Sequence, residues 1–444
     1  MKARSQAAYR SAGLLILFLA VGAFLRIETL TKRPLWHDEI YTLGVVNSAH
    51  SLADIWAASG RDRAEQPLMY YGAAYAAWRL SKHEKSIRVP ACLVGILSIP
   101  LLGALAYRLA GARAALLSSL LLTLSVYHIE YSQDARSYTL LIFWSLTAFH
   151  GFLSFVRSKS IAGLVLLTLS ILGSLYTHHA AVFVGGAIAI AGLSFVVHRW
   201  WASGSFPLWL CGGLAGSSVV VALGFWPQLA HVNSFLASSD LDREHTLALT
   251  GRFFVELFNR WTFGAPWGIL SIGLVALGLI RSCRSLERAA ILLPWVAMPF
   301  LVFGFVPFGK FFDIRFVITA LPPFLILVGS GLDWMIEGMA STLARLARLR
   351  DTGRTSLGYS IAALCAVVLV WSAVGPYLTF RRLKLRCSDF FYRPVVMRQQ
   401  DGFCRRQLIL NSLWRSDSFP ILRKYPPSEK HGSETTSADP AGRR

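Results

Sequence analysis

Long apolar blocks separated by short polar links run through most of the chain. Each block supplies most of the roughly 20 residues that cross a bilayer core as a helix. The blocks lack the alternation of a membrane barrel strand, and backbone amides cannot stay unpaired in lipid. The pattern therefore predicts an all-α polytopic membrane protein with about 11 transmembrane helices. The predicted spans are residues 12–30, 87–108, 112–128, 138–156, 161–177, 180–198, 207–229, 265–281, 289–308, 316–337 and 357–378.

The Lys and Arg residues between the spans gather on one side of the predicted topology. This side shares the N-terminus, so the positive-inside rule places it in the cytoplasm. The basic links are residues 108–113, 157–159, 281–288 and 345–354. The opposite loops then face outward, and three of them contain enough polar residues to matter for function. These three are residues 31–86, 128–137 and 230–264.

The first outer loop, residues 31–86, is too polar to span and is rich in Trp and Tyr, which favour the membrane–water interface. We expect an interfacial helix over residues 67–81, because a proline at a helix start loses no hydrogen bond. We expect residues 1–378 to form a transmembrane domain and residues 379–444 a basic tail, partly disordered. An odd number of spans places this tail outside.

Composition and charge agree with a membrane protein and exclude several other classes. The chain is 54% hydrophobic and 15% charged, whereas a soluble domain carries about 25% charged residues. The net charge of +20 comes from Lys and Arg spread over short links and the tail, so we expect no nucleic-acid partner. The six cysteines show no C-x-x-C spacing, and we predict no zinc site.

Two acidic strings lie in the first outer loop. Asp38 and Glu39 follow closely on the first span, where carboxylates are costly and usually have a role. The alternative is an ordinary solvated pair. Glu65 and Gln66 come directly before the expected interfacial helix. One interpretation is that they bind a substrate. The alternative is that they form an ordinary helix N-terminus, where acidic residues are stabilised.

A third polar string, Tyr127 to Tyr138, lies between two apolar spans with hardly any loop. A helix from residue 138 onward would hold Asp134, Arg136 and Tyr138 near the outer membrane surface. Arg136 would then pair with a carboxylate or hold a phosphate. The alternative is a structural ion pair between Asp134 and Arg136.

Two more polar elements lie at the outer ends of predicted spans. His178 and His179 are adjacent and point in different directions on a helix, which favours hydrogen-bonding or substrate-facing roles over metal ligation. Lys310 and Arg315 fill an outward turn, where cations stabilise an anionic leaving group or merely reach the interface.

In order and content these strings resemble the GT-C glycosyltransferase superfamily. The bacterial members concerned are similar to protein O-mannosyltransferases, lipid A aminoarabinose transferases and Rgt-type galacturonosyltransferases. Residues 36–39 match the family's Asp-Glu pair, and later elements match Glu/His-x-Pro-Leu-Tyr-Tyr, Tyr-Ser-Gln-Glu-Ala-Arg-x-Tyr, Tyr-Thr-His-Tyr and Arg-Tyr-Leu-x-x-x-Leu-Pro. These later matches are residues 65–71, 131–138, 176–179 and 315–322.

The resemblance covers residues 12 to about 335 and includes departures. Asp134 replaces the usual Glu, His179 replaces Tyr, and Phe316 replaces Tyr. The outer C-terminal domain of many relatives is reduced to a short basic tail. The implied fold is a GT-C bundle with interfacial helices in its first outer loop, in a bacterial inner membrane with a periplasmic site.

The implied reaction moves one sugar from a polyprenyl-phosphate donor to an acceptor hydroxyl with inversion. Acceptors of this family include lipid A or lipopolysaccharide, other envelope glycans and proteins. Asp38 would be the general base and Glu39 would orient it or bind the acceptor, while Arg136, Arg315 and Lys310 would stabilise the leaving phosphate. Some relatives bind a divalent cation and others do not, so metal use stays open. The remaining substrate-binding candidates are Glu65, Gln66, Tyr131, Gln133, Asp134, Tyr138, His178 and His179.

Two rival functions belong to other classes. A transporter or flippase of lipid-linked saccharides would also need many helices, but it should place coupling charges near the bilayer midplane, often at broken helices in two related halves. Here the candidate charges collect at one face and no halves repeat. A non-catalytic envelope scaffold would not need both the Asp38 and the Arg136 strings.

Overall fold

The structure is a computed structural model of the 444-residue chain. It describes residues 2–33, 35, 37–59, 68–230, 249–305, 314–348 and 351–386, which all belong to one compact unit, residues 1–400. Every regular element within these residues is helical. This confirms the predicted all-α fold class.

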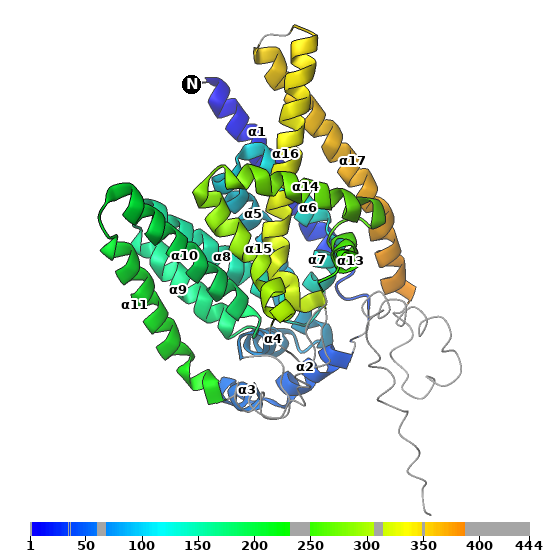
Figure 1. The fold of residues 1–444 in the computed structure, drawn as a ribbon. Helices are drawn as coiled ribbons and strands as arrows, with labels where there is room; N and C mark the ends of the chain where they lie inside the picture. Colours follow the sequence, from blue (N-terminus) through cyan, green and yellow to red (C-terminus); the bar gives the residue numbers. More distant parts are fainter. Residues whose placement is uncertain are drawn as a thin grey trace, which may run out of the picture. The chain divides into compact units, whose positions relative to one another are not determined.

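The helices fall into a first-loop group and a bundle of longer helices (Figure 1). The first-loop group comprises α2 (His37–Ser48), α3 (Leu52–Ser59), α4 (Leu68–Ser81) and the 3₁₀ helix η1 (Glu84–Arg88). The other elements are α1 (Lys2–Ile27), α5 (Val89–Ala110), α6 (Ala112–Leu124), α7 (Val126–Ser132), α8 (Tyr138–Ser158), α9 (Ile161–Leu175), α10 (Ala181–Ser203), α11 (Leu208–Phe225), η2 (Trp226–Gln228), α13 (Gly251–Trp261), α14 (Ala265–Cys283), α15 (Leu286–Phe305), η3 (Ile314–Ala320), α16 (Leu321–Leu346) and α17 (Asp351–Arg386).

Among the described residues, 8 helices are long and apolar enough to cross a membrane, and a bent pair raises the number to 9. Two shorter apolar helices are Gly13–Ile27 and Ile161–Leu175. The eleven predicted spans are therefore reached only if the bent pair and both shorter helices also cross.

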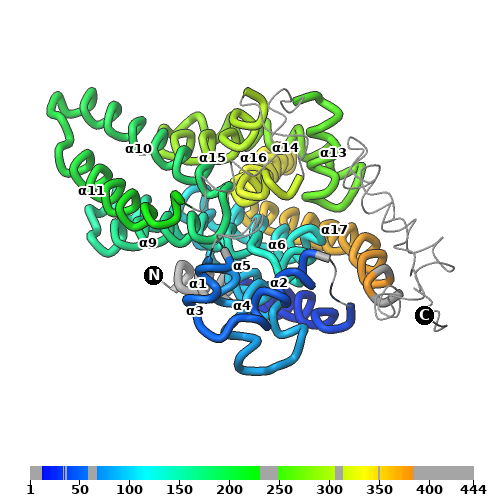
Figure 2. Tube along the Cα trace, turned by 90° about the horizontal axis from the view of Figure 1, so that it is seen from below, coloured from blue at the N-terminus to red at the C-terminus, as the bar shows by residue number. Residues whose placement is uncertain are grey.

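Tight turns reverse the chain between successive helices and sort the connections into two ends of the bundle. Lys159 (φ 52°) and Gly204 (φ 66°) end α8 and α10 in the left-handed conformation that stops a helix. The α5–α6, α8–α9, α10–α11, α14–α15 and α16–α17 turns lie at one end, which we call the basic end. The first-loop helices, the 133–137 link, the 176–180 turn and η3 lie at the opposite, site end (Figures 1 and 2).

Small residues let the central helix α16 pack closely on its neighbours, and 94% of its apolar window is buried. A Cβ atom added to Gly331 would lie 2.1 Å from the carbonyl oxygen of Leu274 in α14. One added to Gly278 would lie 2.2 Å from the carbonyl oxygen of Leu327. The backbones of α14 and α16 therefore approach too closely for any side chain at these positions.

The predicted span 112–128 is wrong in its end, because α6 stops at Leu124 and α7 continues at a bend of 59°. Ser125 makes the break: its extended backbone ends α6, and its hydroxyl accepts the amide of His128 to start α7. The fully buried Arg26 donates to the carbonyls of Leu122 (3.0 Å) and Thr123 (3.3 Å) that the break releases.

The outer loops contain more helix than the sequence indicated. The first loop has three α-helices rather than one, and Tyr70, Tyr71 and Tyr75 of α4 are buried in a cluster with α2 and α3 rather than facing lipid. The 230–264 loop contains α13, which has one polar and one apolar face. Its polar residues are why the sequence did not predict a helix here. The end of the chain also differs, since α17 runs to Arg386 through the start of the expected tail.

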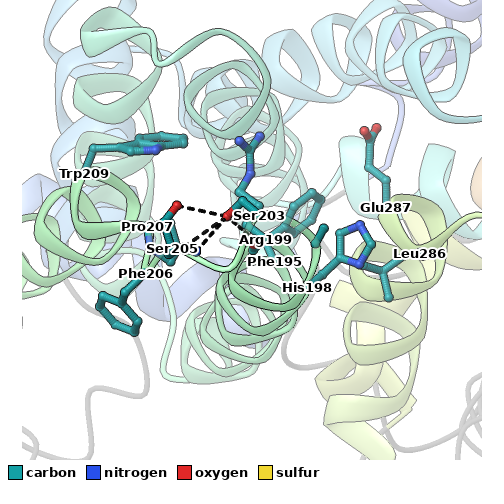
Figure 3. A pocket seen from close by; sticks show the side chains of 11 residues that line it. Phe195, His198, Arg199, Ser203, Ser205, Phe206, Pro207, Trp209, Leu286 and Glu287 are labelled. Carbon is teal, nitrogen blue, oxygen red and sulfur yellow. Dashed lines mark hydrogen bonds between the residues drawn. The ribbon is translucent and has the colours of Figure 1, made fainter.

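A hollow of about 480 Å³ lies at the basic end, where the end of α10 and the start of α11 meet the start of α15 (Figure 3). It is formed beside the α10–α11 turn, and polar and apolar residues both line it.

Candidate active site

Asp38 is the meeting point of two arginines that come from distant parts of the chain. Its Oδ2 lies 3.4 Å from Nη2 of Arg136 and 3.4 Å from Nη1 of Arg315. Asp38 stands in the first turn of α2, where the helix N-terminus favours an acid. Arg136 comes from the link before α8, and Arg315 from η3. Asp38 is 21% exposed and Arg136 only 5%, so the carboxylate is partly accessible beside a nearly buried cation.

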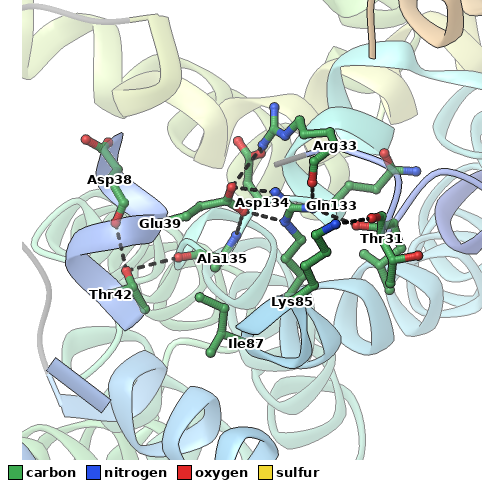
Figure 4. Close-up of polar contacts among 12 residues, drawn as sticks. Thr31, Arg33, Asp38, Glu39, Thr42, Lys85, Ile87, Gln133, Asp134 and Ala135 are labelled. Carbon is green, nitrogen blue, oxygen red and sulfur yellow. Dashed lines mark hydrogen bonds and ion pairs between the residues drawn. The ribbon is translucent and has the colours of Figure 1, made fainter. Parts of the chain in front are cut away.

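The neighbouring Glu39 is buried in a hydrogen-bonded lock (Figure 4). Its two carboxylate oxygens accept Nε and Nη2 of Arg88, each at 2.7 Å, and Oε1 also accepts the backbone amide of Ala135 at 2.8 Å. Arg88 further donates to the carbonyls of Leu30 (2.8 Å) and Arg33 (2.9 Å). This lock joins α2, the 133–137 link and the start of α5, so it fixes where Asp38 stands.

Asp134 and Gln133 point to the side of α1 rather than to Asp38. Asp134 is buried and forms an ion pair with Arg33, which lies 3.6 Å from Glu39 as well. Asp134 therefore pairs with Arg33, and Arg136 pairs with Asp38, both outside the string of residues 127–138. Gln133 donates to the carbonyl of Arg26 (3.0 Å) and accepts from Thr29 (3.0 Å) and Lys384. The geometry of both residues favours positioning over substrate contact.

An aromatic wall continues from the arginines. Tyr131 and Tyr138 pack edge to face with ring centroids 5.0 Å apart, and Tyr138 lies 5.5 Å from the ring of His178. The guanidinium of Arg315 lies 5.7 Å from the Tyr138 centroid, within cation–π range. The rings of His178 and His179 lie 6.5 Å apart.

His178 is held neutral. Burial, followed by the charges of His179, Arg136 and Arg315, lowers its pKa to about 3. Its Nδ1 accepts the amide of Ala180 at 3.0 Å, so the proton of the neutral ring belongs on Nε2. Burial also lowers the pKa of His179. These histidines can serve as neutral hydrogen-bonding groups beside the arginines.

Three predicted site residues, Glu65, Gln66 and Lys310, lie outside the described residues. No group of three His, Cys, Asp or Glu side chains that could hold a metal ion occurs in the described parts of the chain.

Sequence reasoning missed the residues that hold the site together. Arg88 gave one signal, a charge directly before a long apolar span. Lys384 gave none, because its partner Gln133 lies 251 residues away. The same end of α17 contacts α1, since Tyr377 and Arg381 bind Glu28 at 3.2 Å and 3.0 Å.

The arrangement of helices is that of the GT-C fold, as the motifs predicted. ArnT from Cupriavidus metallidurans in the apo state is 20% identical with a TM-score of 0.55, covering 85% of this chain and 74% of that one. The structure of the same protein bound to undecaprenyl phosphate is 20% identical with a TM-score of 0.53, and the match covers the same shares of the two chains. Protein-family models and curated proteins gave no match to the sequence.

A second protein shares the fold at lower sequence identity. The archaeal oligosaccharyltransferase AglB from Archaeoglobus fulgidus, in complex with an inhibitory peptide and a dolichol-phosphate, is 12% identical with a TM-score of 0.56. The match covers 85% of this chain and 56% of AglB. At these identities the likeness establishes the fold.

Proposed function

We propose that this protein is an inverting glycosyltransferase that moves a sugar from a polyprenyl-phosphate donor to an acceptor hydroxyl. The observation that carries the proposal is the single carboxylate oxygen of Asp38 facing both Arg136 and Arg315 at 3.4 Å. A base beside two cations is what a hydroxyl nucleophile and a phosphate leaving group require. The undecaprenyl phosphate and dolichol-phosphate of the two fold relatives support this class of donor.

In the proposed reaction the acceptor hydroxyl attacks the anomeric carbon as its proton passes to the Asp38 carboxylate. The bond between the anomeric carbon and the phosphate oxygen breaks, and the lipid phosphate leaves with the electron pair. Its added negative charge is stabilised by Arg136 and Arg315. Attack from the face opposite the phosphate inverts the anomeric centre.

The donor phosphate and Asp38 would share the same two cations. The separations of 3.4 Å exceed the roughly 2.7–2.9 Å of strong charge-assisted hydrogen bonds. Both contacts are therefore longer than optimal, and a phosphate could compete with Asp38 for the two guanidiniums. This exchange would leave the Asp38 carboxylate free to receive the acceptor proton.

The proposal also includes a sidedness for the candidate active site. Basic turns at one end of the bundle belong in the cytoplasm by the positive-inside rule, which puts the Asp38 end in the periplasm of a bacterial inner membrane. Acceptors there carry free hydroxyls on lipid A or lipopolysaccharide, other envelope glycans or proteins. The apolar bundle would hold the prenyl chain of the donor.

A flippase of lipid-linked saccharides is the second candidate, favoured by the broken α6–α7 pair with Arg26 and His128 buried beside it. Against it, both terminal nitrogens of Arg26 donate to carbonyls, and Nη2 also lies 2.8 Å from Nδ1 of His128, which suits a fixed cap better than a moving coupling charge.

The test is a transfer assay with purified full-length protein, candidate polyprenyl-phosphate sugars and defined acceptors. Asp38→Asn should lower turnover about a hundredfold or more, the usual contribution of a general base. Asp54→Asn is the matched control, since Asp54 is an exposed acid of the same loop that only caps α3. Unchanged turnover in Asp38→Asn would remove Asp38 from the mechanism. Transbilayer movement without transfer would identify the flippase instead.

A further inference from the structure

The hollow at the basic end is remote from the candidate active site. Helix α10 begins two residues after His179 and carries His198 and Arg199 near its other end. A helix of that length places them about 27 Å along the axis from its start. The volume of about 480 Å³ is of the size that small ligands occupy. Phe195 and Pro207 are buried residues of its wall.

Two cations contact the indole ring of Trp209, and one of them, Arg199, lines this hollow together with Trp209. The Nζ of Lys159 lies 5.1 Å and the guanidinium of Arg199 5.2 Å from the ring centroid of Trp209. Arg199 lines the hollow and is fixed by a hydrogen bond to the carbonyl of Val156 at 2.8 Å. Like charges gathered on one ring repel each other, and an anion bound at Arg199 would relieve that repulsion.

Glu287, the carboxylate that lines the hollow, does not neutralise Arg199 or Lys159. Glu287 accepts Nε of Arg157 at 2.9 Å and forms an ion pair with that residue. Within the described parts of the chain, no carboxylate lies within ion-pair distance of Arg199 or Lys159. The hollow therefore keeps an excess of positive charge on the side of Trp209.

The surroundings of the hollow belong to the membrane boundary. Phe206, which lines it, is 49% exposed, and the neighbouring Leu208 and Trp201 are 74% and 83% exposed. Only 11% of the apolar window of α11 is buried within the bundle. A ligand with an anionic head and apolar chains would meet cations and lipid-facing surface at the same place.

We propose that this hollow binds the phosphate headgroup of an anionic membrane phospholipid. The phosphate contacts Arg199 in the hollow, and the acyl chains follow the exposed apolar faces of α10 and α11. Basic pockets between transmembrane helices at the cytoplasmic side are typical sites for such headgroups. This site is independent of the proposed glycosyl transfer, because it shares no residue with the candidate active site.

Native mass spectrometry of the delipidated full-length protein tests the proposal, with phosphatidylglycerol and phosphatidylcholine of equal chain length as probes. We expect the protein to bind phosphatidylglycerol in preference, and Arg199→Gln to weaken that binding about five- to tenfold. Arg345→Gln, an exposed cation at the same end outside the hollow, should stay within about twofold of the parent.

Ala202→Phe provides a second variant that fills the hollow without changing its charge. It should also weaken phosphatidylglycerol binding, which protects the test if Arg199→Gln folds poorly. Equal losses from Arg199→Gln and Arg345→Gln would show a general surface potential and overturn the proposal. Complete displacement by inorganic phosphate would assign the hollow to a soluble anion and overturn it as well.

Discussion

Nη1 of Arg315 lies 3.4 Å from Oδ2 of Asp38, although 277 residues separate the two in the sequence. Arg315 is held in place from behind, because its guanidinium covers the rings of Tyr138 and Phe316, each at 5.7 Å. The contact joins the first outer loop to η3 and marks the place where we propose that the reaction occurs.

Arg315→Gln should lower kcat/KM by about a hundredfold or more, because one preorganised donor to a developing charge is removed. Arg315→Lys should restore part of the loss through charge alone. Steady-state transfer kinetics measure both. Arg252→Gln, an exposed cation of α13, is the control. Equal activity of Arg315→Gln and the control would exclude Arg315 from leaving-group stabilisation.

Glu39→Gln should destabilise the protein by about 3–5 kcal/mol, because it leaves the guanidinium of Arg88 buried without its anion. Thermal unfolding in detergent provides the measurement. A double variant, Glu39→Leu with Arg88→Met, should lose less than the two single changes combined. A parent-like Tm for Glu39→Gln would contradict the lock.

Stability should fall on acidification through His178. Its pKa is lowered from 6.5 to about 3 by burial and by nearby positive charge, so the unfolded chain binds the proton more readily. The neutral ring's contribution is complete above pH 6.5 and is lost progressively toward pH 3. Between pH 7.5 and pH 5 the loss should be about 2 kcal/mol.

His178→Asn keeps an acceptor for the Ala180 amide but cannot titrate. Comparing Tm of parent and variant at the two pH values isolates the histidine. An identical pH dependence in both proteins would show that other groups govern the acid response.

Gly331→Ala should destabilise the bundle by about 1–3 kcal/mol, as overpacking does. Its new methyl would lie 2.1 Å from the carbonyl oxygen of Leu274, and backbone cannot yield as a side chain can. Gly338→Ala in the same helix meets nothing within 4 Å and is the matched control. Equal Tm values for the two variants would disprove the close approach of α14 and α16.

Lys384→Met should loosen the end of α17, since it removes the contact with Gln133 while keeping the apolar stem. Hydrogen exchange should rise over residues 377–386 and stay unchanged in α8. Lysine at this position is buried, and burial lowers its pKa well below the ordinary value. Exchange that does not change would mean that the Glu28 contacts alone hold this end.

Sequence predicted the helices of the bundle well, because lipid leaves an apolar block few other structures. It failed where polar side chains decide local structure. The break at Ser125 lies inside an apolar run, and nothing nearby in the sequence shows that Arg26 will bind the released carbonyls. The helices of the first loop were underestimated because burial against one another, not lipid, stabilises them.

The candidate site was predicted as a set of residues rather than as a geometry. Asp38, Arg136 and Arg315 were named from their strings, and the structure brings them together. The division of labour between Asp38 and Glu39 could not be predicted, because it depends on Arg88 and on the backbone of Ala135.

Because Arg315 of η3 pairs with Asp38, the candidate active site is complete only after late parts of the chain have been synthesised. A nascent chain inserted up to α15 already contains Asp38 and Arg136 but lacks Arg315, and α17 reaches Gln133 only at its last turns. Under our proposal, stalled or truncated translation products would be inactive. Incomplete chains would therefore not hydrolyse the donor lipid.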